Sequence, residues 1–153
     1  MTEYDEIDLR LLRALQSDGR ATIQTLSQAV HLSAAACSER VKRLRESGVI
    51  TGFTARLDPA AVGLPLLIFV EVSLDRTTHE ATERFAAAVR EAPDILECHM
   101  VAGGFDYLLK ARVRDMGAYR AFLGETLMTM AGVREMRTYA VLEEVKSTTV
   151  LAL

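Results

Sequence analysis

Residues 22–48 read TIQTLSQAVHLSAAACSERVKRLRESG, and this stretch encodes two helices separated by the break His31-Leu32-Ser33. Apolar residues recur at helical spacing before the break, at Ile23, Leu26 and Val30, and after it, at Cys37, Val41 and Leu44. Ser33 can cap the second helix, and Gly48 suits the left-handed turn that ends it. A helix, a tight turn and a second helix are typical of the helix-turn-helix motif.

The flanking residues extend this motif into a larger domain. A further helix begins behind Asp5, with an inner side made of Ile7, Leu11, Ala14 and Leu15. An extended wing covers residues 49–57, and a softer junction follows at residues 60–64. We therefore predict a winged helix-turn-helix DNA-binding domain with a hinge strand over residues 4–65.

Local charge, and not the total charge, points to a nucleic acid. The chain of 153 residues has a formal net charge of -3 at pH 7, which by itself favours neither nucleic acid nor membrane. Between residues 18 and 56, however, six residues are basic and three are acidic, and four of the six lie on the second helix of the motif. A basic outer side on an isolated helix is more often a solvated surface, but the three-helix context favours DNA. The predicted contacts are Ser33, Ala34 and Ser38 near bases, and Arg40, Lys42, Arg43 and Arg45 at bases or phosphates.

The second half of the chain changes to period two. We predict strands over residues 66–74, 95–101, 105–113 and 133–145, and helices over residues 77–90 and 115–130. Thr77 and Glu80 have capping-box spacing for the first of these helices, and Asp115 and Gly132 can begin and end the second. The order βαββαβ is that of a ferredoxin-like domain, here over residues 66–153. The whole chain is thus of the α+β class.

Two of these strands are apolar on both faces. Leu67 and Phe69 lie opposite the main apolar set of strand 66–74, and Leu108 does the same on strand 105–113. Helices cover only one face of such a sheet, so the second face needs another cover, most simply the same sheet of a second subunit. We therefore expect a homodimer formed through this half.

The turn Val101-Ala102-Gly103-Gly104-Phe105-Asp106-Tyr107 admits two interpretations. A Gly-Gly pair is a common hairpin turn. Two glycines also expose backbone N–H groups, and Asp106 and Tyr107 add an acceptor and a hydroxyl, which suit the two charged ends of an amino acid. On these residues alone both interpretations stay open.

The remaining residues predict no catalysis, no metal site and no cofactor. Cys98 and His99 are adjacent on a strand and point to opposite faces, and no second pair has zinc spacing. Neither a phosphate-binding glycine loop nor a nucleophile elbow occurs, and Cys37 is expected in the core. The longest strongly apolar run, residues 64–70, is far shorter than the ~20 residues that cross a bilayer, and the acidic start lacks the pattern of a secretion signal. We expect a cytoplasmic protein without membrane contact.

Long ordered runs of the chain resemble the Lrp/AsnC family of feast/famine regulators. In the first half they include Glu39-Arg40-Val41, Gly48-Val49-Ile50 and Gly52-Phe53-Thr54. In the second half they include Glu97-Cys98-His99, Phe105-Asp106-Tyr107-Leu108-Leu109-Lys110, Leu123-Gly124-Glu125-Thr126-Leu127 and Glu143-Glu144-Val145-Lys146. The resemblance implies a winged helix-turn-helix joined by a hinge to a ferredoxin-like ligand-binding domain of the RAM or ACT type.

The resemblance also implies partners and a site. Members of the family regulate transcription by binding double-stranded DNA, form homodimers that assemble into octamers, and respond to a small amino acid, leucine-like or other, bound between dimers. By position, the effector pocket falls on Gly103, Gly104, Phe105, Asp106 and Tyr107, with Met100, Tyr139, Ala140 and Val141 nearby. Asp106 would receive the ligand's ammonium, and backbone groups around Gly103 and Gly104 its carboxylate. We therefore expect a sequence-specific transcriptional regulator of amino-acid metabolism.

Two alternatives share this scaffold. Siroheme decarboxylases are similar to the family in both halves, but such an enzyme needs cationic or imidazole groups around a porphyrin. His31, His79 and His99 are instead scattered over a turn, a helix start and a strand. The second alternative is an architectural DNA-binding protein without an effector, in which no amino acid would change the oligomeric state.

Overall fold

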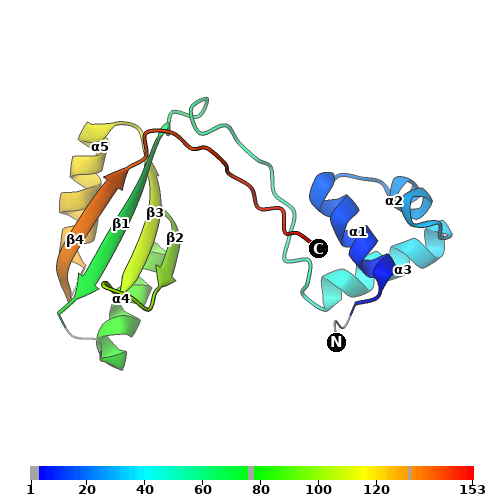
Figure 1. Cartoon of the computed structure of the whole chain (residues 1–153), viewed down its shortest axis with the longest axis horizontal. Helices are drawn as coiled ribbons and strands as arrows, with labels where there is room; N and C mark the ends of the chain where they lie inside the picture. The colour runs from blue at the N-terminus through cyan, green and yellow to red at the C-terminus, as the bar shows by residue number, and fades with distance from the viewer. Residues whose placement is uncertain (1–3, 76–77, 131) are drawn as a thin grey trace. The chain divides into compact units, whose positions relative to one another are not determined.

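The computed structural model describes residues 4–75, 78–130 and 132–153, which form two compact units (Figure 1). The helical unit comprises the chain up to Arg56 together with Lys146–Leu153, and the sheet unit comprises Leu57–Val145. Each unit has its own hydrophobic core. The predicted domain division between residues 65 and 66 stays a prediction.

Three short helices make up most of the helical unit: α1 (Glu6–Ser17), α2 (Ile23–Val30) and α3 (Ala34–Glu46). The side chains of Asp5, Thr22 and Ser33 each accept a backbone N–H of the following first turn, as N-caps do. Gly48 has the expected left-handed backbone, with φ at 78°. The apolar stripes meet in a core of Leu11, Leu12, Leu26, Val30, Cys37 and Leu44, which confirms the core position predicted for the cysteine.

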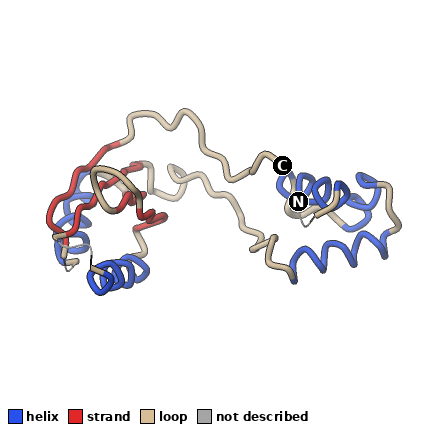
Figure 2. The backbone as a smooth tube through the Cα atoms, turned by 60° about the horizontal axis from the view of Figure 1, so that its bottom comes forward, coloured by secondary structure: helices blue, strands red, loops and turns tan. Residues whose placement is uncertain are grey.

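The segment after α3 forms no strand within the chain. Residues 51–58 have neither helix nor strand, and Figure 2 draws them as loop. A strand requires a neighbour that satisfies its backbone hydrogen bonds, and among the described residues only β1 to β4 pair in a sheet. The hinge strand predicted here stays a prediction.

The sheet unit has the predicted βαββαβ order. Strands β1 (Leu66–Leu74), β2 (Ile95–Met100), β3 (Tyr107–Val113) and β4 (Val133–Ala140) form one antiparallel sheet in the order β2-β3-β1-β4. Helices α4 (His79–Glu91) and α5 (Met116–Ala121) both pack on one face of it (Figures 1 and 2). Fully buried residues between the layers include Ile68, Val70, Val72, Phe85, Leu109 and Ala111. This arrangement confirms the predicted fold class.

Besides shifts of one or two residues at the end of β2, the start of β3 and the end of α4, three element boundaries differ from the sequence-based prediction. The helix expected over residues 115–130 is regular only as α5, after which Phe122–Thr126 forms a π-helical turn and Leu127–Thr129 a 3₁₀ turn. Gly124 lies in the π-helical turn and has a low helix propensity, which weakens the regular ladder there. Strand β4 ends at Ala140 and not at residue 145, because its partner β1 begins directly after Pro65.

The third difference is the start of α4. The helix begins at His79, and Thr78 caps it by accepting the N–H of Ala81 at 3.3 Å. Thr77, the predicted cap, lies outside the described residues. Among the described residues the cap of α4 is Thr78, one residue later than the predicted one.

The second face of the sheet mixes apolar and charged side chains. Leu67 is buried there, and Phe69 and Leu108 are half-buried. Between them lies an ion pair in which Lys110 Nζ is 2.8 Å from Glu97 Oε1. The homodimer expected through this face stays a prediction.

Candidate nucleic-acid interface and amino-acid site

Helix α3 presents most of its predicted DNA contacts to solvent. Cys37 and Leu44 are fully covered by the other two helices, which fixes the opposite side of α3 as the outer one. The exposed members of the predicted set are Ser33, Ala34, Ser38, Lys42, Arg43 and Arg45, whereas Arg40 is half-buried. The outer side also carries the acidic residues Glu39 and Glu46.

Arg40 and Arg43 hold a buried carboxylate on α1. Asp8 is 1% exposed, and its two oxygens accept hydrogen bonds from Arg40 Nη1 at 2.8 Å and from Arg43 Nη2 at 2.6 Å. Arg40 Nη1 also donates to Asp5 Oδ2 at 2.8 Å. We name Asp5, Asp8, Arg40 and Arg43 the Asp8 cluster. It links the start of α1 to the middle of α3.

Hydrogen bonding within the Asp8 cluster favours the charged forms of Arg40 and Asp5. The bond to Asp5, followed by the bond to Asp8, raises the pKa of Arg40 above its ordinary value. The backbone N–H of Asp8, followed by the guanidinium of Arg40, lowers the pKa of Asp5. Arg40 and Asp5 are therefore charged at neutral pH.

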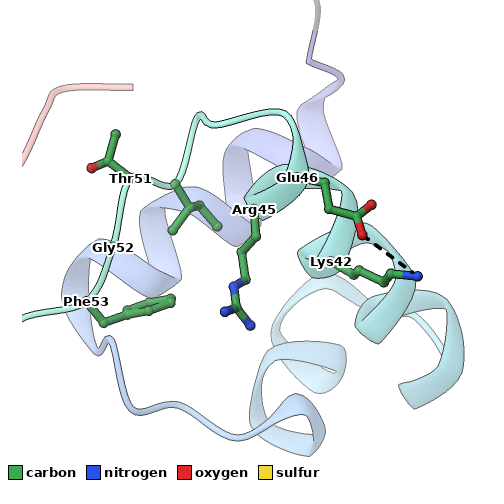
Figure 3. Close-up of a pocket in the computed structure, with 7 residues that line it drawn as sticks. Lys42, Arg45, Glu46, Thr51, Gly52 and Phe53 are labelled. Carbon is green, nitrogen blue, oxygen red and sulfur yellow. Dashed lines mark ion pairs between the residues drawn. The ribbon is translucent and has the colours of Figure 1, made fainter.

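Lys42 and Arg45 extend from the outer side of α3 beside a groove. The groove has a volume of about 600 Å³ and is lined by Lys42, Arg45 and Glu46 of α3 and by residues 50–53 (Figure 3). Lys42 is only loosely paired, with its Nζ 3.9 Å from Glu46 Oε1, and both side chains are exposed. Arg45 has no ion pair among the residues that the structure describes. These two cations can reach phosphate oxygens without breaking a strong internal bond.

The predicted effector turn lies between β2 and β3, and Asp106 fastens it to β1. Asp106 Oδ2 accepts the N–H of Leu74 at 2.7 Å, and the Asp106 N–H donates to the carbonyl of Val72 at 3.0 Å. Gly103 and Gly104 are exposed, neither has a left-handed φ, and a Cβ at either position would meet no atom within 4 Å. The hairpin turns that demand glycine need a positive φ, so the fold of the chain itself does not require glycine here.

Other predicted effector residues lie elsewhere. Tyr107 is buried in the core, where its ring stacks on Phe85 at a centroid distance of 4.6 Å and burial raises the pKa of its hydroxyl. Met100 is exposed and lines a cavity with Tyr107 beside α4. Tyr139 is exposed, and a hydrogen bond to Glu71 raises the pKa of its hydroxyl.

The end of β4 supplies the last two predicted residues. Ala140 is exposed, while Val141 is half-buried and donates its N–H to Leu67 at 3.0 Å. The described chain thus gathers residues 103–106 in one loop. It does not bring Met100, Tyr107 or Tyr139 into one cavity with that loop.

A cleft beside this loop contains charged residues that the sequence analysis missed. It has a volume of about 130 Å³ and is lined by Gly104 and Phe105 of the loop, Glu71 and Ser73 of β1, and Glu135 and Arg137 of β4. Strand register explains the grouping, because Glu71 pairs with Arg137 and Ser73 with Glu135. The guanidinium of Arg137 suits the carboxylate of an amino acid, and the carboxylates of Glu71 and Glu135 suit its ammonium group. These residues lie on strands far apart in the sequence, so the grouping could be seen only once the strand register was known.

The described residues contain no candidate metal site and no helix that could span a membrane. No group of three or more His, Cys, Asp or Glu side chains in residues 4–75, 78–130 and 132–153 could hold a metal ion. Within the same ranges no helix combines the length and the apolar character needed to cross a membrane.

Two families match the two halves of the chain. The family described as winged helix-turn-helix DNA-binding matches residues 4–51. The family described as Lrp/AsnC ligand binding domain matches residues 67–151, which is more than half of the chain.

Similar proteins span nearly the whole length. The leucine-responsive regulatory protein of Salmonella typhimurium is 51% identical over 144 residues, covering 94% of this chain and 88% of that protein. A transcriptional regulator from Neisseria meningitidis, solved as a complex with L-methionine, is 40% identical with a TM-score of 0.92 and covers 97% of this chain and 96% of that chain. An AsnC family transcriptional regulator from Agrobacterium tumefaciens is 32% identical with a TM-score of 0.92, covering 97% of each chain.

Proposed function

The chain belongs to the Lrp/AsnC family of transcriptional regulators, and we propose that it binds double-stranded DNA through α3 and alters this binding when a small amino acid occupies the loop between β2 and β3. One observation supports this proposal most directly. The same chain contains an exposed cationic helix, α3, and a sheet unit in which the loop between β2 and β3 places glycine backbone beside charged side chains.

The DNA half of the proposal rests on how α3 distributes its cations. The N-terminal residues of a recognition helix face base edges, which assigns Ser33, Ala34 and Ser38 to that role. Lys42 and Arg45, beside the groove of Figure 3, would contact phosphates and supply the salt-dependent part of the affinity. Arg40 and Arg43 are held by Asp8 and would act from fixed positions.

The amino-acid half rests on the loop and on one relative. The relative from Neisseria meningitidis was solved with L-methionine, and it is similar to this chain over nearly its full length. Here Gly103 and Gly104 leave room that no side chain of the described residues fills. Glycine in such a place is expected where a ligand approaches the backbone closely. We propose that the loop N–H groups and Arg137 bind the carboxylate, and that Asp106 receives the ammonium.

Assembly and location complete the proposal. We propose that homodimers form through the second face of the sheet and assemble further, as octamers, so that recognition helices are duplicated at fixed spacing. The half-buried Phe69 and Leu108 support this assignment. We also propose that the chain acts in the cytoplasm, without cofactor or catalysis. A visible absorbance band of a bound porphyrin in the purified protein would contradict this part.

Calorimetry with each of the twenty amino acids tests the effector half. We expect at least one amino acid to bind and to change the affinity of the full chain for a duplex or its oligomeric state. Asp106→Asn keeps an oxygen for the N–H of Leu74 but loses the charge, so it should lose amino-acid binding and retain DNA binding. Glu97→Gln is the matched control, because it removes a carboxylate from the same sheet away from the loop.

The outcomes separate the alternatives. Undiminished amino-acid binding by Asp106→Asn would show that the site is misplaced. Absence of binding by all twenty amino acids, with DNA binding intact, would favour the architectural alternative.

A further inference from the structure

Two of the four basic side chains of α3, Arg40 and Arg43, are bound to a buried carboxylate in the Asp8 cluster. Asp8 is 1% exposed, lies on a different helix, and is bound by both guanidinium groups at 2.8 and 2.6 Å. The side chain of Arg40 is 26% exposed, and that of Arg43 is 60% exposed. Arg43 thus has one edge on Asp8 while the rest of its side chain faces outward.

We propose that Asp8 is a positioning residue for DNA recognition. It fixes the direction in which Arg40 and Arg43 point and balances charge that would otherwise attract any phosphate backbone. This inference rests on the proposed DNA-binding function.

The chemistry of the arginine side chain supports a fixed presentation. A guanidinium has five N–H donors in a rigid plane, so a bond from one Nη to Asp8 sets the direction of the remaining donors. A free arginine at the same place would sample many rotamers and find phosphates of any sequence. Buried ionic groups add little net stability but can select one geometry, which is the role inferred here.

The Lys42–Glu46 pair on the same helix shows the contrast. Its atoms are 3.9 Å apart and both side chains are more than half exposed, at 62% and 67%. Such an exposed pair four residues apart holds neither side chain in place. Glu46 is therefore a matched control for Asp8, because its loss changes the net charge equally without releasing a fixed arginine.

The test compares Asp8→Asn with Glu46→Gln in the full chain. The probes are a duplex selected by the wild-type chain from a random-sequence pool and a scrambled duplex of the same composition. Fluorescence anisotropy gives both affinities at several salt concentrations. For Asp8→Asn we expect tighter binding to the scrambled duplex. The dependence of affinity on salt concentration should be steeper by up to about 2 per bound subunit, at ~0.9 per extra phosphate contact. The ratio of the affinity for the selected duplex to the affinity for the scrambled duplex should be about tenfold lower. Glu46→Gln frees Lys42 beside the groove, so we expect tighter binding to both duplexes alike and a selected-to-scrambled ratio at the wild-type value.

A second variant covers the case in which Asp8→Asn does not fold. Asp8→Asn combined with Arg40→Gln keeps the net charge of the wild type and still frees Arg43 from its carboxylate. Arg40 is itself a predicted DNA contact, so the reference for this variant is Arg40→Gln alone, in which Asp8 still binds Arg43. We expect a lower selected-to-scrambled ratio for the double variant than for Arg40→Gln, with a salt slope closer to that of the wild type. A loss of the ratio at unchanged net charge cannot come from general attraction to phosphates.

Results that contradict the role of Asp8 differ from results that contradict DNA binding itself. If Asp8→Asn folds and keeps the wild-type ratio, or changes it as much as Glu46→Gln does, or if the double variant folds and has the ratio of Arg40→Gln, Asp8 only stabilises the fold and the inference is wrong. If the wild-type chain itself binds neither duplex, the proposed DNA binding fails instead.

Discussion

At the residue scale, Ser33 serves the fold before it can serve recognition. Its hydroxyl oxygen accepts the N–H of Ala36 at 3.2 Å and caps α3. A residue predicted to lie near bases is therefore also the start of the helix that presents the other contacts. Any DNA effect of changing it includes this structural part.

Ser33→Ala should lower the stability of the helical unit by about 1 kcal/mol, the usual cost of losing a helix N-cap. Ser33→Asp, which retains a capping oxygen, should be close to wild type in stability. Chemical denaturation followed by circular dichroism measures both. Equal stability of the alanine variant and the wild type would mean that the cap contributes nothing.

Asp5 makes the helical unit sensitive to acid. Its folded pKa is lowered from an ordinary value of 3.8, first by the N–H of Asp8 and then by Arg40, so folding favours the ionised form. This stabilisation is complete above the ordinary pKa and is lost as the pH falls through the lowered folded value.

The comparison is with Asp5→Asn, which can still cap α1 but cannot be charged. The wild type should melt at a higher temperature at pH 6, and the difference should shrink as the pH falls below about 4. Thermal melts across this range measure it. A difference that is constant with pH would exclude the ion pair as its cause.

Caps could be predicted from sequence, whereas the Asp8 cluster could not. A cap depends on residues three positions apart, so the local pattern is sufficient for Thr22 and Ser33. Asp8 binds partners 32 and 35 positions away. Asp8 lies one helical turn before Leu11 and Leu12, which are on the buried side of α1. This helical spacing was the sequence signal that the carboxylate points inward.

At the element scale, the C-terminal segment lies along α1 within the helical unit. Gln16 forms two hydrogen bonds with the backbone of Leu151: its Nε2 donates to the carbonyl at 3.1 Å, and its Oε1 accepts the N–H at 2.6 Å. Arg13 Nε donates to the carbonyl of Leu153 at 2.9 Å. These bonds hold an otherwise irregular segment on a helix.

Gln16→Ala should release this segment. The Leu151 amide should be protected from hydrogen exchange in the wild type, where it donates to Gln16, and should exchange in the variant at close to the rate of an unstructured amide. Gln24→Ala on α2 is the control, since this exposed glutamine lies on a different helix. Unchanged protection of Leu151 in Gln16→Ala would contradict the docking.

Regular elements were predictable where periodicity was unbroken. Strand β1 was predicted to the residue, because alternation and Pro65 mark its limits. The change from α5 to a π-helical turn at Phe122 was not, since the apolar pattern continues through it while the hydrogen bonding changes. The charged cleft beside Gly104 was missed for a similar reason, because it depends on the register between β1 and β4.

At the scale of the whole molecule, the proposed homodimer depends on the second face of the sheet. Phe69 lies there between Lys110 and Tyr139 of the neighbouring strands. Phe69→Glu would place a charge in a subunit interface, and taking that charge out of water is unfavourable even beside Lys110. We therefore expect this variant to be monomeric in analytical ultracentrifugation.

Met116→Glu is the control for a charge introduced at an exposed apolar residue, because Met116 is 51% exposed at the start of α5. It should retain the wild-type oligomeric state. An oligomer of unchanged size in Phe69→Glu would place the interface elsewhere.

The central claim is that the outer side of α3 binds DNA, and the salt dependence of duplex binding by Lys42→Gln/Arg45→Gln tests it most directly. We expect this double variant to bind a duplex more weakly than the wild type does. The dependence of its affinity on salt concentration should be smaller by up to about 2 per bound subunit, at ~0.9 per lost phosphate contact. Arg84→Gln/Arg120→Gln, which removes two exposed cations from α4 and α5, should bind as the wild type does. If the Lys42→Gln/Arg45→Gln variant has the affinity and the salt dependence of the wild type, the outer side of α3 does not bind DNA.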